Sequence, residues 1–140
     1  MSEELKHEYA RYATAETERS LSERINLPWF EGMQDWDLIA ADAGRVSEFL
    51  KIYQNGDLND DERFALMQLI VASLDDLIDE NSDFERNVSW VKCKTILTNE
   101  FWLHISTIHY WSLLEKDVNE GFPITKHIRP IWEDVKSHFQ

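Results

Sequence analysis

The stretch 100–118, EFWLHISTIHYWSLLEKDV, decides the fold class of this 140-residue chain. At about 100° per residue, its apolar residues point to all sides of a helix: Phe101, Trp102, Leu103, Ile105, Ile108, Tyr110, Trp111 and Leu114. A helix that is apolar all round is normally buried, and this one is too short and too often interrupted by Ser, Thr and His to span a membrane. The pattern predicts a central buried helix, with Phe101, Leu103, Ile105, Ile108, Trp111 and Leu114 mostly inside.

The flanking segments also repeat apolar residues at helical spacing. Helices are predicted over 2–25, 36–54, 60–80, 83–97 and 130–139, with a break in the first one near Ala13–Ala15. Expected caps are Ser2, Asp35, Asn59 with Glu62, Ser82 with Glu85, and Asn99. Asn55–Gly56 is expected to end a helix in the left-handed conformation, and Pro130 to open the last helix. The prediction is an all-α, compact bundle of five to six helices that forms a single domain over 1–140.

The net charge of −13 is concentrated in the middle of the chain. Residues 31–85 contain fifteen acidic side chains and only three basic ones, Arg45, Lys51 and Arg63. Binding to nucleic acid or to an anionic membrane is disfavoured, because both depend on Lys and Arg. A basic protein partner is favoured, since opposite surface potentials accelerate encounter and select the partner. The alternative is that acidity only keeps the protein soluble.

Two acidic motifs resemble metal sites but lack the rest of the pattern. Asp75, Asp76 and Asp79 match the DDxxD motif of helical isoprenoid synthases, which need a longer helical barrel and a second acidic motif. Asp57, Asn59 and Asp61 have the spacing of a calcium loop, but Glu62 stands where Gly is required. A solvated helix end and a helix cap are the expected structures, and no metal or other cofactor is predicted.

The polar residues of the 100–118 stretch offer weak candidates for chemistry. Glu100 and His104 lie one turn apart and share a metal only if a third ligand exists, whereas His104 and His109 lie about 140° apart and do not converge. Buried histidines satisfied by hydrogen bonds are the expected outcome. Cys93, beside Lys92 and Lys94, is expected to be a packed thiol, although neighbouring cations can activate a cysteine. No catalytic signature is present, and the prediction is a non-enzymatic protein.

Six Trp residues exceed what a helical domain of this size needs for its core. One or two of them are expected at the surface as interface anchors, where Trp and Tyr are enriched. A homodimer formed through such residues is one alternative for the assembly of the protein.

Three segments together carry a resemblance to a known group of proteins. They are Phe64–Ile70 (FALMQLI), His104–Ser112 (HISTIHYWS), and Phe122–Thr125 (FPIT) with Ile128–Pro130 (IRP). They resemble small, acidic, helical bacterial proteins of the immunity type, which are encoded beside polymorphic secreted toxins. The resemblance covers roughly half of the chain and implies a protein that binds and neutralises a cognate toxin; it assigns no functional residue.

The leading hypothesis is an acidic immunity protein that covers the basic site of a cognate toxin, such as a nuclease. Its expected partner-binding residues are Asp57, Asp60, Asp61, Asp75, Asp76, Asp79, Glu80 and Asp83. The alternatives are a helical metal-binding protein or small enzyme that uses Glu100, His104 and nearby carboxylates, and a homo-oligomeric regulatory or structural module. A single cysteine and the charged start MSEELKHEYA favour the cytoplasm.

Overall fold

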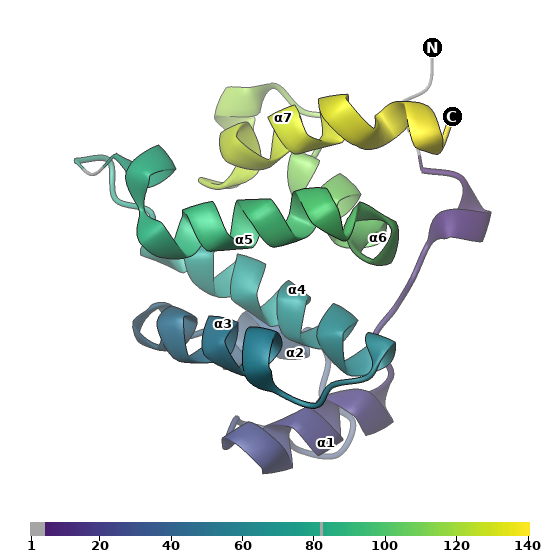
Figure 1. The fold of residues 1–140 in the computed structure, drawn as a ribbon, viewed down its shortest axis with the longest axis vertical. Helices are drawn as coiled ribbons and strands as arrows, with labels where there is room; N and C mark the ends of the chain where they lie inside the picture. Colours follow the sequence, from purple (N-terminus) through teal and green to yellow (C-terminus); the bar gives the residue numbers. More distant parts are fainter. Residues whose placement is uncertain (1–4, 82) are drawn as a thin grey trace. The chain divides into compact units, whose positions relative to one another are not determined.

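The computed structural model describes residues 5–81 and 83–140. Within these residues the chain forms seven α-helices, several 3₁₀ turns and no strand, which confirms the predicted all-α fold (Figure 1). The chain divides into two compact parts: a middle unit, Tyr12–Leu77, and a terminal unit, Met1–Arg11 with Ile78–Gln140. The expectation of a single domain remains a prediction. The caps expected at Ser2 and Ser82 lie outside the described residues.

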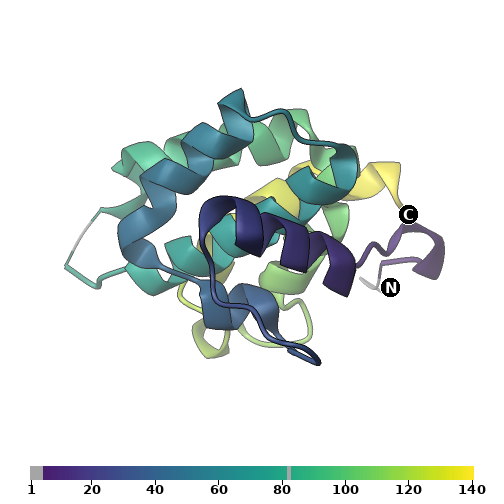
Figure 2. The ribbon, with the colours of Figure 1, turned by 90° about the horizontal axis from the view of Figure 1, so that it is seen from below.

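The middle unit is built around α4 (Asp60–Leu77). Three shorter helices pack on it: α1 (Ala15–Ile25), α2 (Trp36–Ala40) and α3 (Val46–Asn55) (Figures 1 and 2). The buried residues of α4 follow one another with hardly a gap: Phe64, Ala65, Leu66, Met67, Leu69, Ile70, Val71, Ala72, Ser73 and Leu74. Such a run covers every side of a helix, so α4 has the all-round burial that the sequence predicted for 100–118.

The start of α4 confirms the predicted capping box. The Glu62 backbone N–H donates to Asn59 Oδ1 at 2.8 Å, and the Asn59 N–H donates to Glu62 Oε1 at 3.1 Å. Both bonds satisfy backbone donors that the first turn of a helix leaves unpaired. The helix ends at Leu77, three residues before the predicted end at Glu80.

The helix predicted over 36–54 is wrong, because the chain breaks between α2 and α3. Asp42 Oδ1 accepts a hydrogen bond from the Gly44 N–H at 2.9 Å, and the Asp42 N–H donates to Ser73 Oγ at 2.9 Å. These bonds hold a turn in place of a continuous helix, as short polar side chains often do. Asp35 adopts a left-handed conformation and makes no side-chain cap. Ile39, an apolar residue of this segment, is 52% exposed.

Two other boundaries depend on caps. The helix predicted over 2–25 is wrong for residues 5–14, which contain only a 3₁₀ turn, His7–Tyr9. Helix α1 begins at Ala15, where Thr14 Oγ1 accepts from the Thr17 N–H at 3.1 Å. The left-handed end expected at Gly56 is wrong, since its φ is −75°. The Gly56 N–H instead donates to the Ile52 carbonyl at 2.7 Å, and a Cβ at this position would lie 2.4 Å from that oxygen.

The terminal unit contains α5 (Val88–Asn99), α6 (Phe101–Ser112) and α7 (Thr125–Val135). Helix α6 packs against α5 and α7, and Ile105, Ile108 and Trp111 are buried as predicted. On its other side, Trp102 and Tyr110 are exposed to solvent. The remaining residues that were predicted to be buried are only partly covered: Phe101, Leu103 and Leu114. The all-round burial expected of this helix is therefore wrong.

Helix α6 also ends earlier than predicted, at Ser112, where a residue of α7 bonds its last carbonyl group and two carbonyl groups of the segment that follows. Arg129 donates from Nε to the Ser112 carbonyl (2.7 Å) and from Nη2 to the carbonyls of Leu113 (2.8 Å) and Lys116 (2.6 Å). Leu113 turns the chain in the left-handed conformation. Pro130 lies inside α7 and does not open it, and the cap predicted at Asn99 is wrong, since Glu100 precedes α6 without a side-chain cap bond.

The segment 5–11 belongs to the terminal unit through contacts with residues far along the chain. The Arg11 N–H donates to Ser106 Oγ at 2.7 Å, and this hydroxyl donates to the Tyr9 carbonyl at 3.4 Å. The Tyr9 ring packs edge-on against Phe139, with centroids 5.0 Å apart. In both ribbon views this segment and the end of α7 lie side by side (Figures 1 and 2).

Candidate functional site

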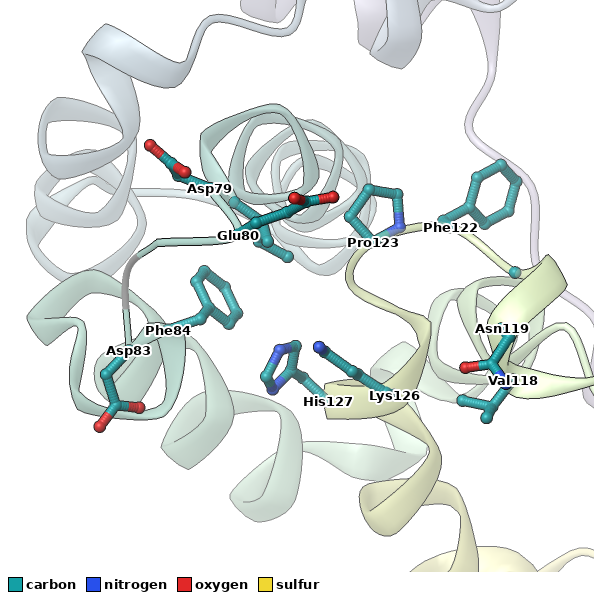
Figure 3. Close-up of a pocket in the computed structure, with 12 residues that line it drawn as sticks. Asp79, Glu80, Asp83, Phe84, Val118, Asn119, Phe122, Pro123, Lys126 and His127 are labelled. Carbon is teal, nitrogen blue, oxygen red and sulfur yellow. The ribbon is translucent and has the colours of Figure 1, made fainter.

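A pocket of about 670 Å³ lies beside the first turn of α7 in the terminal unit (Figure 3). We call it the α7 pocket. Three segments of the terminal unit line it: the loop that follows α4, the loop before α7, and α7 itself. The lining residues are Ile78, Asp79, Glu80, Asp83, Phe84, Val118, Asn119, Gly121, Phe122, Pro123, Lys126 and His127.

Short-range hydrogen bonds shape the loop after α4. Asp79 Oδ1 accepts from the Asn81 N–H at 2.9 Å, and Asp83 forms an ion pair with Arg86 at 3.3 Å. A 3₁₀ turn, Phe84–Arg86, follows and buries the Phe84 ring. The loop therefore presents carboxylates to solvent and one aromatic ring to the interior of the unit.

The opposite wall is fixed by Thr125. Its hydroxyl accepts from the Phe122 N–H at 3.0 Å and donates to the Trp111 carbonyl at 2.9 Å. This bond is buried and joins the start of α7 to α6, while Pro123 prevents the preceding loop from becoming helical. Lys126 and His127 are thereby held on the first turn of α7.

His127 and Glu85 form a close pair beside the pocket. His127 Nδ1 lies 2.5 Å from Glu85 Oε2, and the same oxygen accepts from Trp90 Nε1 at 3.0 Å. The Lys94 ammonium lies 3.6 Å from the other carboxylate oxygen. The imidazole also packs against the Phe84 ring, with centroids 4.7 Å apart, and its side chain is only 11% exposed.

The surroundings of Glu85 favour its ionised form. Burial raises the pKa of this carboxyl, but the hydrogen bond and charge of His127, the charge of Lys94 and the Trp90 bond outweigh it, so the pKa lies below its ordinary value. An ionised carboxylate only accepts hydrogen bonds, which places the proton on His127 Nδ1. The other ring nitrogen, Nε2, is buried without a hydrogen-bond partner among the described residues.

Two opposite charges face the α7 pocket without an ion pair. Within the described part of the chain, neither Glu80 nor Lys126 pairs with a charged side chain, and both are exposed. In Figure 3, Glu80 and Lys126 lie on opposite sides of the pocket, Phe84 lies to the left of both and near His127, and the carboxylate of Asp83 points away. The pocket thus has two exposed, unpaired charges of opposite sign, while the Phe84 ring beside it is buried.

The eight predicted partner-binding residues occupy three places. Asp57 lies in the loop before α4 and Asp60 and Asp61 in its first turn, Asp75 and Asp76 lie in its last turn, and Asp79, Glu80 and Asp83 line the α7 pocket. All are exposed except Asp75, which is partly covered. Because α4 has 18 residues and rises about 1.5 Å per residue, the groups at its two ends are about 20 Å or more apart. They do not form one cluster.

Sequence reasoning missed a pair of carboxylates in the middle unit, Glu18 on α1 and Asp37 on α2. Burial, with the nearby charge of Asp37, raises the pKa of Glu18 to about 7. Burial also raises the pKa of Asp37, with a further contribution from Asp35, although backbone hydrogen bonds oppose this. These residues lie far apart in the sequence, and no local motif indicates that they meet.

The residues of the metal and enzyme alternative are not gathered into a site. His104 is fully buried at a local distortion of α6, and the His109 ring packs on Trp132 with centroids 5.0 Å apart. Over the residues that the structure describes, no group of three or more His, Cys, Asp and Glu side chains has the arrangement of a metal site. Cys93 is fully buried, and burial raises the pKa of its thiol far above the ordinary value, as expected for a packed thiol.

One Trp is an exposed surface residue, as the composition suggested. Trp102 is 58% exposed and lies beside Phe139, with ring centroids 4.6 Å apart. The fully or nearly fully buried Trp residues are Trp36, Trp90, Trp111 and Trp132.

Comparison with known proteins gives no assignment. A scan against protein-family models, a search of curated proteins and a search of solved structures each found no match. Among the described helices, none has both the length and the apolar character that crossing a membrane requires.

Proposed function

We propose that this chain is a non-enzymatic binding protein that neutralises a basic partner protein in the cytoplasm. One observation carries the proposal: Asp57, Asp76 and Glu80 are exposed carboxylates that form no ion pair within the described residues. Unpaired surface charge is available to a partner, and together with the net charge of −13 it favours a partner of opposite charge.

The kind of partner follows from the charge and from the resemblance to immunity proteins. A nuclease toxin has a basic surface because it binds phosphates, and an acidic protein that covers this surface blocks the substrate. Cytoplasmic residence follows from the same role, since the toxin acts on the cell contents. We propose a cognate toxin domain as the partner, and neither nucleic acid nor a membrane.

The test is binding to the toxin domain encoded by the neighbouring gene, measured by calorimetry at low and high salt. Salt is expected to weaken binding by screening the charges. A quadruple variant, Asp75→Asn, Asp76→Asn, Asp79→Asn and Glu80→Gln, is expected to bind more weakly. The matched control removes four exposed carboxylates elsewhere, in Glu8→Gln, Glu16→Gln, Glu115→Gln and Glu120→Gln. Equal affinity of the two variants, or binding that salt does not change, would contradict the proposal.

The exposed aromatic side chains of α6 favour a second candidate, self-association as a homodimer. Trp102 and Tyr110 are both more than half exposed, and aromatic residues are enriched at the centres of interfaces. Sedimentation of the protein and of a Trp102→Ala variant tests it: a dimer that the substitution dissociates supports self-association, and a monomer at high concentration excludes it.

A further inference from the structure

We propose that Asn55 is a site of spontaneous deamidation, in which the backbone nitrogen of Gly56 attacks the side-chain amide once the last turn of α3 has opened. These two residues form the one Asn–Gly pair of the sequence. The inference concerns the middle unit and is independent of the proposed partner. It depends on the exposure of Asn55, on the space around Gly56 and on the hydrogen bond that the Gly56 N–H donates.

The Asn55 side chain is free to move. Asn55 is the last residue of α3 and is exposed. Among the residues that the structure describes, none forms a hydrogen bond with its side chain. The side-chain amide can therefore rotate toward the following backbone nitrogen, and water reaches it directly. Asparagine is also one of the thermally labile residue types of proteins.

Position 56 accommodates only glycine without a shift of the backbone. A Cβ there would lie 2.4 Å from the Ile52 carbonyl oxygen and 3.3 Å from Leu58 Cγ. The first of these contacts is far too short and involves a backbone atom, so the close approach of the chain requires a residue without a side chain. The same lack of a side chain leaves the Gly56 nitrogen sterically open to the Asn55 amide. The packing of this turn thus places a reactive pair at the end of α3.

The reaction needs water and no other reagent. The Gly56 nitrogen forms a bond to Asn55 Cγ, the bond from Cγ to Nδ2 breaks, and the proton of the Gly56 nitrogen passes through the solvent to the departing ammonia. The product is a cyclic imide, which water opens at either of its carbonyl groups. Cleavage between Cγ and the nitrogen gives aspartate, and cleavage between the main-chain carbonyl carbon and the nitrogen gives isoaspartate. No atom is oxidised or reduced.

The native structure restrains the first step. The Gly56 N–H donates to the Ile52 carbonyl at 2.7 Å, at the end of α3. The nitrogen must leave this bond before it can lose its proton and reach the Asn55 side chain. Helix ends open at a small cost in free energy, so the bond slows the reaction without stopping it. We expect the native chain to react about two- to ten-fold more slowly than the unfolded chain, the factor that the net contribution of one hydrogen bond gives.

The experiment incubates the full chain in neutral buffer, with and without guanidinium chloride, and follows the peptide that contains residue 55 by chromatography and mass spectrometry. Asparagine should be lost at this position, with aspartate and isoaspartate as products, and the loss should be faster in the denaturant by the factor above. Asn99 and Asn119 serve as internal controls, because glutamate follows each of them. Asn55→Gln is the matched variant, and it should stay unmodified since its longer side chain would have to close a larger ring.

Three outcomes would overturn the proposal. Asn55 that stays intact in the native chain while the unfolded chain reacts would mean that the last turn of α3 does not open. Equal rates with and without denaturant would show that the bond to Ile52 has no part in the reaction. Loss at Asn99 and Asn119 as fast as at Asn55 would remove the role of Gly56.

Discussion

Replacing Ile108 with Ala should destabilise the protein strongly. Ile108 is 0% exposed and lies on the side of α6 that packs within the terminal unit. The substitution removes three carbon atoms, which costs about 2.4 kcal/mol at about 0.8 kcal/mol for each buried group. The cavity left behind adds to this, because a packed interior relaxes only partly, so we expect a total of about 3–4 kcal/mol, within the range known for such changes.

The assay is equilibrium unfolding in urea, followed by Trp fluorescence and by circular dichroism. Val91→Ala is the control, because Val91 lies on α5 of the same unit and is 48% exposed; we expect a change within about 0.5 kcal/mol. The helix should remain intact in the Ile108 variant, since Ser112 Oγ bonds to the backbone carbonyl of residue 108 and not to its side chain. A loss of less than about 0.5 kcal/mol for Ile108→Ala would refute the assignment of this side of α6 to the core.

Three further changes have defined outcomes. Burial and the charge of Asp37 raise the pKa of Glu18 from 4.5 to about 7, so the native state binds a proton that the unfolded state releases, and stability falls as the pH rises from about 4.5 to about 7. Glu18→Gln should remove this fall in thermal unfolding measured across that pH range, and a variant with the same pH profile as the parent would contradict the prediction. Asn59→Ala removes the side chain that caps α4 and should cost about 1 kcal/mol in urea unfolding, whereas no loss would mean that the cap contributes nothing. Cys93, fully buried, should react with iodoacetamide only after unfolding, and rapid labelling of the native protein would show that the thiol is accessible.

Features decided by neighbouring residues could be predicted from the sequence. The capping box of Asn59 and Glu62 is one example, since both of its hydrogen bonds span three residues. The break at Asp42 is also a short-range feature, but its second bond goes to Ser73 on another helix. Periodicity alone favoured a continuous helix there, and the tertiary bond favours the turn.

Features decided by distant residues could not be predicted in this way. The end of α6 depends on Arg129, which satisfies three carbonyls that precede it by 13 to 17 residues. No glycine marks the turn, and Leu113 takes the left-handed conformation that usually favours one. The α7 pocket is similar: the acidic residues Asp79, Glu80 and Asp83 were predicted to bind a partner, but their association with Lys126 and His127 follows from tertiary contacts.

Residues 5–11 pack on later segments of the terminal unit, and this packing has a consequence for the order of folding. The bond between Arg11 and Ser106 spans 95 positions, and Tyr9 meets Phe139 near the opposite end of the sequence. During synthesis this segment emerges from the ribosome long before its partners, and closing so long a loop carries an entropic cost. The middle unit, continuous from Tyr12 to Leu77, can form while translation is still under way. Attachment of residues 5–11 to the terminal unit therefore follows the synthesis of α7 and of Phe139.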